Sequence, residues 1–197
     1  MPPTLAAPFV YHNREAENKA SENFLNRVEN AFGYPVIVKE AHGSLGMQVY
    51  LIDNRKDLSA IYDRLKHTPH LYQRFVAESR GLDIRVYVIG GKAAGACERR
   101  NDSDFRSSVL YGGKMSVLPH GIGGGVKPTG FLTEYIGLAE KAARLLNLDY
   151  CAVDFLKGEN GPLLCEINSN AFFNTYVGLG GNDIAAEYVS YIRKRLL

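Results

Sequence analysis

The stretch "DYCAVDFLKGENGPLLCEINSN", residues 149–170, reads as two short apolar strands joined by a turn rich in Gly, Asn and Pro. Asp154, Glu166 and Asn168 interrupt the apolar runs. If the loop is the three-residue connection Glu159-Asn160-Gly161, Asp154 lies directly opposite Glu166, and Asn168 shares their face. The stretch therefore predicts a β-hairpin with three oxygen-bearing side chains on one face.

Two carboxylates that lie directly opposite each other repel, which costs stability or raises one pKa unless a cation lies between them. Carboxylate and amide oxygens suit Mg²⁺, whose shell is completed by phosphate oxygens and water. The alternative is the solvated outer face of an ordinary hairpin. We expect Mg²⁺, or alternatively Mn²⁺, at Asp154, Glu166 and Asn168.

Composition narrows the class of protein. The chain has 197 residues, 46% of them hydrophobic, which is enough for one domain or two small ones with a proper core. Its formal net charge of +2 gives no reason to expect a nucleic-acid or membrane partner, and no apolar run approaches the roughly 18 residues of a membrane span. Cys97, Cys151 and Cys165 lie in apolar runs without Cys-x-x-Cys spacing, so we expect buried free thiols and a cytoplasmic setting.

Helices and strands alternate irregularly, which predicts an α+β fold and not a regular parallel βαβ series. Apolar spacing predicts helices at 14–32, 55–67, within 129–148 and at 184–197, with Thr129 and Thr133 as caps of the third. Strands are expected at 34–40, within 41–52, at 70–76 and in hairpins at 82–100 and 149–170. We expect two lobes, residues 1–72 and 73–197.

The first lobe carries a candidate phosphate site. Lys39 closes a strand of Val and Ile, where a charge is costly unless it emerges into a site with an opposite charge. The loop that follows contains Gly43, Ser44 and Gly46, which can turn backbone N–H groups toward phosphate. It is not a Walker A loop, because no Gly-Lys-Ser/Thr ends it, and an ordinary β-turn is the alternative.

The second lobe carries further polar residues. Within "GLDIRVYV", residues 81–88, period-two alternation places three side chains on one face, which is either a site or an exposed sheet face: Asp83, Arg85 and Tyr87. Three arginines follow around a polar loop: Arg99, Arg100 and Arg106. Their guanidinium groups suit phosphate or carboxylate, and a solvated basic loop is the alternative.

Three stretches together resemble the RimK-type ATP-grasp carboxylate–amine ligases: "PVIVKEAHGSLGMQVYL", "LDIRVYVIGGKAAGACERRNDSDFRSS" and "AVDFLKGENGPLLCEINSN". The similarity runs from about Pro2 to the C-terminus. Its most specific motif is an Asp followed, 12 residues on, by Glu-x-Asn. The resemblance implies an ATP-grasp fold, with two α+β lobes and a nucleotide cleft between them.

The resemblance also implies roles for individual residues. The phosphates of ATP would be contacted by Lys39, Arg106, Ser107 and Ser108, under a flexible lid formed by Gly43, Ser44 and Gly46. The adenine pocket would be lined by the backbone of Gln73, Arg74 and Phe75, and Asp83 would hold the ribose. The magnesium ligands would be Asp154, Glu166 and Asn168, and the catalytic arginines would be Arg85 and Arg106.

In that family ATP phosphorylates a carboxylate, and an amine then displaces phosphate from the acyl phosphate to form an amide. The implied partners are ATP, a carboxylate acceptor on a protein tail or small molecule, and an amino acid, with homo-oligomerisation left open. Magnesium and arginines would neutralise the transferring phosphoryl group, and lid closure would exclude water. A nucleotide-binding module without turnover and an ATP-grasp ligase of another subgroup are the alternatives.

The sequence departs from the family pattern in several places. Arg74 stands where the family usually has Glu, and Met47 and Gln48 replace a more glycine-rich end of the lid. "NSNAFFNTYVGLGG" lacks the Ser-Pro-Gly of glutamate-adding members, so the acceptor is expected to differ. Family members usually carry an additional N-terminal α/β domain, so we expect a fragment or a truncated natural form. For such a chain ATP binding is a safer prediction than turnover.

Overall fold

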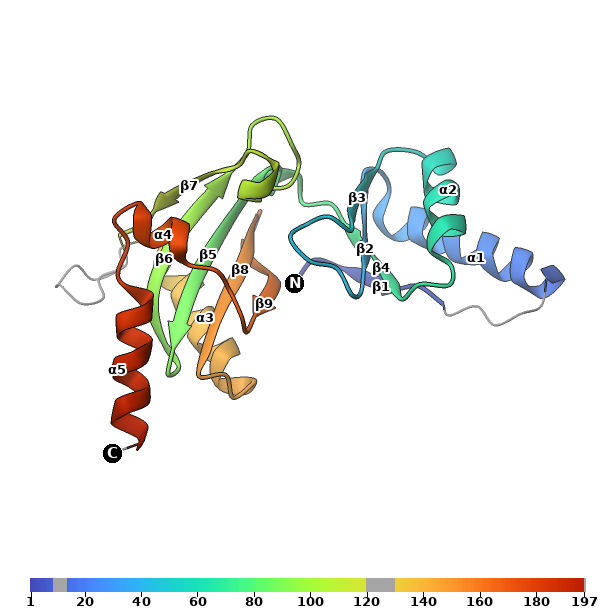
Figure 1. The fold of residues 1–197 in the computed structure, drawn as a ribbon. Helices are drawn as coiled ribbons and strands as arrows, with labels where there is room; N and C mark the ends of the chain where they lie inside the picture. The colour runs from blue at the N-terminus through green and yellow to red at the C-terminus, as the bar shows by residue number, and fades with distance from the viewer. Residues whose placement is uncertain (9–13, 120–129, 197) are drawn as a thin grey trace. The chain divides into compact units, whose positions relative to one another are not determined.

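The computed structural model describes residues 1–8, 14–119 and 130–196 and divides into two compact units, Met1–Ala77 and Glu78–Leu197 (Figure 1). Each unit combines helices with an antiparallel sheet, which confirms the α+β class. The boundary lies after the expected one at residue 72, because the strand His70–Arg74 pairs within the first unit. None of the helices in the described ranges is long and apolar enough to span a membrane.

The first unit contains a four-stranded antiparallel sheet in the order β1-β4-β2-β3. Its strands are β1 (Thr4–Ala6), β2 (Val36–Glu40), β3 (Val49–Ile52) and β4 (His70–Arg74). Helices α1 (Arg14–Phe32) and α2 (Arg55–Leu65) pack on one face of this sheet (Figure 1). The sheet therefore has one face buried by helices, as the apolar spacing predicts.

Alternation along β2 decides which side chains enter this core. Val36 and Val38 are fully buried beneath α1 and α2. Successive strand residues point to opposite faces, so Lys39 lies on the face away from the helices, where it is half-buried. Gly33, with φ +65°, ends α1 as expected, because its amide donates to the carbonyl of Glu29 in a left-handed cap.

The second unit contains a five-stranded antiparallel sheet in the order β7-β6-β5-β8-β9. Its strands are β5 (Leu82–Ile89), β6 (Lys92–Arg100), β7 (Lys114–Val117), β8 (Tyr150–Gly158) and β9 (Gly161–Asn168). Its helices are α3 (Leu132–Leu145), α4 (Asn174–Gly178) and α5 (Ile184–Leu196), and single 3₁₀ turns span Ala77–Ser79 and Val109–Tyr111. Helix α3 covers one face, and α4 and α5 pack on the other (Figure 1).

The two faces of β5 have different partners, as the alternation predicts. Ile84, Val86 and Val88 pack against α3. Tyr87 points to the other face, where it is fully buried beside Tyr176 of α4. This second face of the sheet is therefore an apolar core where α4 and α5 cover it. The part of the same face that they do not cover carries Asp83 and Arg85 of β5.

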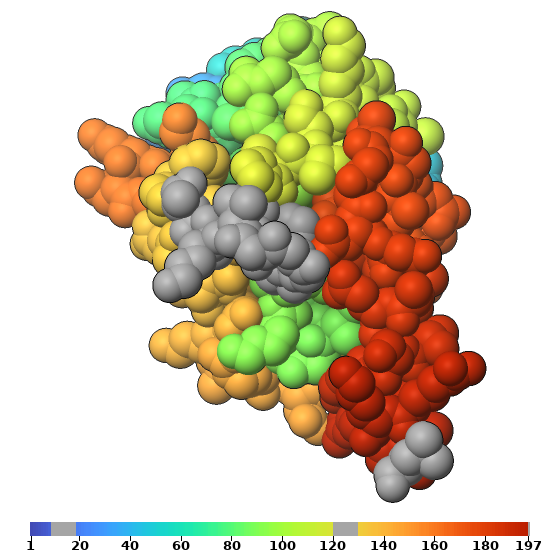
Figure 2. Space-filling view, turned by 90° about the vertical axis from the view of Figure 1, so that its left-hand side faces the viewer, coloured from blue at the N-terminus to red at the C-terminus, as the bar shows by residue number. Residues whose placement is uncertain are grey.

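The turn of hairpin β5–β6 is the expected Gly90-Gly91 pair, with φ values of +57° and +74°. Two successive residues with positive φ form the turn that matches the twist of a two-residue hairpin. Figure 2 shows this turn, in green, between α3 and α5. Its closeness to Tyr191 explains the glycine, since a Cβ at Gly90 would lie 2.4 Å from that ring.

Several expectations need correction. Helix α3 begins at Leu132 after Phe131, which makes no side-chain cap bond, so Thr133 lies inside the helix and the cap prediction was wrong. Thr129 and the glycine-rich loop 120–128 lie outside the described residues. Short elements without a strong period were missed, namely β1, β7 and α4.

The three cysteines are thiols outside disulfide bonds, as expected. Cys97 and Cys151 are buried, and burial raises the pKa of Cys97 to about 12 and that of Cys151 to about 11. Both are therefore unreactive thiols at neutral pH. Cys165 is only half-buried, so full burial was the wrong expectation for this one.

Candidate nucleotide and metal site

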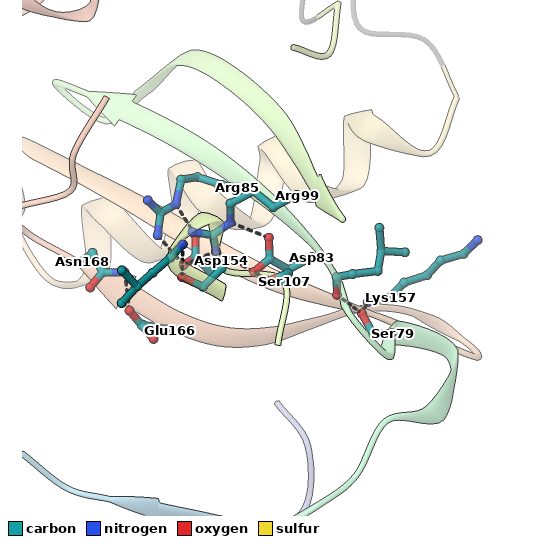
Figure 3. Close-up of polar contacts among 12 residues, drawn as sticks. Ser79, Asp83, Arg85, Arg99, Ser107, Asp154, Lys157, Glu166 and Asn168 are labelled. Atoms are coloured by element: carbon teal, nitrogen blue, oxygen red, sulfur yellow. Dashed lines mark hydrogen bonds and ion pairs between the residues drawn. The ribbon is translucent and has the colours of Figure 1, made fainter. Parts of the chain in front are cut away.

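The polar side chains of the second unit converge on one face of its sheet (Figure 3). Strand pairing places Asp83 opposite Arg99, and Arg85 opposite Asp154. Asp154 in turn lies opposite Glu166. Residues directly opposite in neighbouring strands share a face, so four strands contribute to one polar surface beyond the core under α4 and α5.

Four of these side chains form what we call the buried charge network: Asp83, Arg85, Arg99 and Asp154. Arg85 donates from Nε and Nη2 to the two carboxylate oxygens of Asp154, both at 2.7 Å. Arg99 donates from Nε and Nη2 to the two oxygens of Asp83, at 2.7 and 2.5 Å, and from Nη2 to Asp154 at 2.9 Å. These side chains are only 5–12% exposed, so two guanidinium groups and two carboxyl groups are paired with one another largely away from solvent.

The two carboxylates respond differently to this site. Burial raises the pKa of Asp154, but the Arg99 and Arg85 guanidiniums lower it by more, so it lies below its usual value. Burial also raises the pKa of Asp83, and there the Arg99 guanidinium does not offset it. Asp154 is thus the carboxylate held more firmly in the ionised form, which is the form that a cation requires.

Arg99 reaches this face because hairpin β5–β6 is irregular. An unbroken register from the Gly90-Gly91 turn would place Asp83 opposite Glu98. A bulge at Ala94 shifts the pairing by one residue, so that Asp83 faces Arg99 instead. The hypothesis of a solvated basic loop was therefore wrong for Arg99.

Hairpin β8–β9 has the predicted pairing of Asp154 with Glu166 but not the predicted loop. The turn is the two-residue connection Glu159-Asn160, with Gly158 paired to Gly161. A bulge at Cys165 then shifts the register by one residue. The missing loop residue and the added bulge residue compensate, which is why the predicted pairing is confirmed.

Oxygen donors at this hairpin fit a hard divalent cation. Glu166 is exposed and Asn168 is half-buried, and the Asn168 amide donates to Oε1 of Glu166 at 2.5 Å. A carboxylate offers about four acceptor positions, so the three arginine bonds to Asp154 leave room for one more partner. Among the described residues no three His, Cys, Asp or Glu side chains are grouped so that they could hold a metal ion. The candidate ligands are therefore the carboxylates of Asp154 and Glu166 and the amide oxygen of Asn168.

The segment expected at the phosphates lies beside the network. Ser107 Oγ donates to Oδ2 of Asp83 at 2.5 Å. Ser108 Oγ accepts from the amide of Leu110 and caps a 3₁₀ turn. Asp83 thus accepts three hydrogen bonds and its side chain is 9% exposed, and its contact with a ribose stays a prediction.

Arg106 is held within its own loop. Its Nε and Nη2 donate to the two carboxylate oxygens of Asp104, at 3.0 and 2.8 Å, and its guanidinium lies 3.4 Å from the centroid of the Tyr111 ring. The hydrogen bonds from the Arg106 side chain lower the pKa of Asp104, and the same bonds raise the pKa of Arg106. The side chain therefore remains charged, and contact with a phosphate would compete with Asp104.

In the first unit, the expected lid is a closed turn. Ser44 donates its amide to Oε1 of Gln48 at 3.0 Å, and its carbonyl accepts from the amide of Met47. Gly46 has φ +77°, a conformation that favours glycine. Gly43 lies against Gln48, since a Cβ there would be 3.1 Å from the Gln48 Cβ. The Gln48 side chain thus occupies one of the amides that the sequence offers to phosphate.

The residues expected at adenine lie where β4 ends. Gln73 is buried and donates from Nε2 to Thr4 Oγ1 at 2.9 Å. The amide of Arg74 donates to the carbonyl of Pro3, so strand β1 engages this backbone group. Phe75 follows the end of the strand and is half-buried.

Two tyrosines lie on the same face of the sheet as the network: the sequence placed Tyr87 there, but Tyr150 was missed. Tyr87 donates its hydroxyl to the carbonyl of Phe172 at 3.1 Å, and Tyr150 donates to the carbonyl of Ala171 at 2.7 Å. These bonds fix the segment that follows Asn168. The alternation that places Tyr87 beside Arg85 was a usable signal, whereas nothing local identifies Tyr150.

The chain consists of two antiparallel α+β units, the second with a charged face at a hairpin, and its fold is that of the ATP-grasp proteins. A family model described as the RimK-like ATP-grasp domain matches residues 12–192, and the chain belongs to this family.

Relatives and solved structures agree with this assignment. The chain is 35% identical over 175 residues to a "Probable alpha-L-glutamate ligase" of Rhodopirellula baltica, covering 87% of the chain and 40% of that protein. It is 30% identical over 177 residues to a "Beta-citrylglutamate synthase B" of Danio rerio, covering 87% of the chain and 41% of that protein. The chain thus spans less than half the length of these two curated relatives.

Solved structures share the fold at lower identity. The ATP-grasp ligase PsnB, complexed with a phosphomimetic variant of its minimal precursor, Mg and ADP, superposes with a TM-score of 0.65 at 20% identity, covering 100% of this chain and 54% of that one. The D-cycloserine synthetase DcsG gives a TM-score of 0.68 at 15% identity, covering 100% and 65%. At these identities the likeness shows the fold alone.

Proposed function

We propose that the chain is the nucleotide- and metal-binding part of an ATP- and Mg²⁺-dependent carboxylate–amine ligase, which forms an amide or peptide bond through an acyl phosphate. The observation that carries the proposal is the polar face of the second unit. There an ionised Asp154, held by two arginines, lies opposite the exposed Glu166. Family membership and relatives named as ligases support it.

Each bound group would have its own residues in this proposal. Asp154, Glu166 and Asn168 would hold Mg²⁺, with Mn²⁺ as the alternative ion, which when bound neutralises negative charge on the phosphates. Lys39, the turn at 43–46 and the segment 106–108 would contact the phosphates of ATP. The backbone at residues 73–75 would line the adenine pocket.

The proposed reaction has two steps. A carboxylate oxygen of the acceptor attacks the γ-phosphorus of ATP, the bond to the bridging oxygen breaks, and ADP leaves. The amine of an amino acid then attacks the acyl carbon and loses a proton as phosphate departs. Arg85 and Arg106 would offset the charge that develops on the transferring phosphoryl group, and the turn at 43–46 would exclude water from the acyl phosphate.

Release of ADP that depends on an added amine tests this proposal. The full chain is incubated with Mg²⁺ and ATP, with citrate or a glutamate-terminated peptide as acceptor and individual amino acids as amines. ADP and phosphate should appear in equal amounts, only with both substrates, and Glu166→Gln should abolish the release. If ATP binds but no combination produces ADP, the chain is a nucleotide-binding module, and the ligase proposal fails.

A further inference from the structure

Arg99 is the only member of the buried charge network, among the described residues, whose guanidinium bonds both carboxylates. Arg85 donates to Asp154 alone within the network. A planar guanidinium presents its donors in a fixed fork, so one rigid group sets the orientation of two acidic side chains. The position of Asp83 is therefore linked to that of Asp154.

Each carboxylate leads to a different part of the candidate site (Figure 3). Asp83 accepts from Ser107 Oγ at 2.5 Å and so holds the segment 106–108, which we assign to the nucleotide phosphates. Asp154 lies opposite Glu166 in the hairpin that we assign to the cation. The chain of contacts Ser107–Asp83–Arg99–Asp154 thus joins the two assignments through side chains that are largely buried.

We propose that Arg99 is a positioning residue that couples binding of the nucleotide phosphates to binding of the divalent cation. The inference rests on the proposed function and goes beyond it, because it assigns the coupling to a residue that touches neither ligand. A cation that draws Asp154 toward Glu166 would move Arg99, and with it Asp83 and Ser107. Coupling is reciprocal, so phosphates that order Ser107 would also favour the cation-binding position of Asp154.

Substitution by lysine separates this role from charge alone. Arg99→Lys keeps a positive charge, but an ammonium is a single point of donation and cannot hold Asp83 through two parallel bonds while also reaching Asp154. The matched control is Arg100→Lys on the next position of β6. Arg100 has a 54% exposed side chain and pairs with Glu98, outside the network.

The measurement is the affinity of the full chain for the non-hydrolysable ATP analogue AMPPNP, by calorimetry, with saturating Mg²⁺ and with EDTA. The ratio of the two affinities is the metal-dependent gain. In Arg99→Lys this gain should fall by about 10- to 100-fold, the usual cost of losing a residue that orients metal ligands, while the affinity in EDTA changes little. Arg100→Lys should retain the parental gain.

The outcomes separate the two proposals. If the parent binds AMPPNP with a metal-dependent gain and folded Arg99→Lys keeps that gain, the coupling inference is overturned and the proposed function stands. A variant that loses both affinities equally also overturns it, since that result indicates a merely structural role. A parent without any metal-dependent gain overturns both.

A second variant covers the case in which Arg99→Lys does not fold. Ser107→Ala removes the hydroxyl that donates to Asp83 but leaves the buried ion pairs intact. Its metal-dependent gain should also fall, because the link from the phosphate segment to Arg99 is cut. An unchanged gain in Ser107→Ala would then overturn the inference.

Discussion

The two sheets keep polar side chains in their interiors in different ways. In the first unit His70 is 5% exposed. Its Nδ1 lies 2.7 Å from the carbonyl of Thr68 and its Nε2 lies 3.1 Å from the hydroxyl of Tyr72. A carbonyl can only accept, so Nδ1 donates to Thr68. Because the pKa of His70 is lowered, the ring is neutral at pH 7 and Nε2 accepts from the Tyr72 hydroxyl. In the second unit the buried charge network instead pairs two carboxyl groups with two guanidinium groups.

The difference supports our proposal that the second sheet carries the binding site. Burial lowers the pKa of His70, by more than the Thr68 carbonyl and the Glu40 charge raise it, so this core avoids a charge. Buried ion pairs contribute little net stability, because desolvation offsets their attraction. We therefore attribute the network of paired acids and arginines to the proposed binding site and not to the stability of the sheet.

Asp154→Asn should break the network and have the largest effect. It leaves Arg85 without a charged partner in the network and Arg99 with Asp83 alone. Removing one member of a buried pair costs about 3–5 kcal/mol of unfolding free energy. Urea unfolding of the full chain measures this loss, and hydrogen exchange of the β5 and β8 amides shows whether it occurs at the network.

Glu166→Gln is the matched control, because it changes the residue directly opposite on an exposed position. Its unfolding free energy should change by no more than about 0.5 kcal/mol, as is usual at the surface. Equal losses in the two variants would contradict the distinction between a buried network and an exposed ligand.

Lys39→Ala extends the comparison to the half-buried charge of the first sheet. If Lys39 contacts phosphate, the variant should lose about 1.5–3 kcal/mol of ATP binding, typical of a hydrogen bond to a charged group. Adenosine binding should not change, and calorimetry with both ligands measures the two effects. Lys56→Ala, on the exposed side of α2, is the control and should leave both affinities unchanged. Equal loss of ATP binding and adenosine binding in Lys39→Ala would contradict the phosphate contact and indicate collapse of the first unit.

His70 should give the smallest effect, a pH dependence confined to the first unit. Its pKa is lowered in the folded state, so below about pH 6.5 the unfolded chain binds a proton that the folded chain does not. Stability should therefore fall as the pH decreases through that value, by at most about 1.4 kcal/mol per pH unit for one proton. Hydrogen exchange of the β2 and β4 amides between pH 5 and 8 follows this slope.

Replacing each histidine in turn identifies the group responsible. His70→Gln should remove the slope, whereas His67→Gln, at an exposed position, should leave it unchanged. A slope that persists in His70→Gln would assign the dependence to another group.

The hairpins show how far the sequence predicts this fold. Apolar alternation and the Gly90-Gly91 turn identify β5 and β6, and the acidic motif identifies β8 and β9. Neither bulge is visible in the sequence, because Ala94 and Cys165 are ordinary strand residues. For β8–β9 the predicted loop was one residue too long, and the unpredicted bulge adds one residue to the strand. The two differences cancel, so the pairing of Asp154 with Glu166 was still predicted correctly.

The site was harder to predict than the strands. The role of Arg99 depends on a shift of one residue, and such a shift exchanges the faces of every side chain beyond it. The contacts of Arg106 with Asp104 and Tyr111 depend on the path of an irregular loop, which has no period to read. Residues fixed by alternation were therefore predictable, and residues fixed by bulges and loops were not.

The central claim is that the face around Asp154 and Glu166 binds a nucleotide together with a divalent cation. Calorimetric titration of ATP into the parent and Glu166→Gln, with and without Mg²⁺ at one salt concentration, tests it most directly. The account predicts binding to the parent that depends on Mg²⁺, and a loss of at least about tenfold in that binding for Glu166→Gln. Equal, Mg²⁺-dependent binding by both proteins would contradict it.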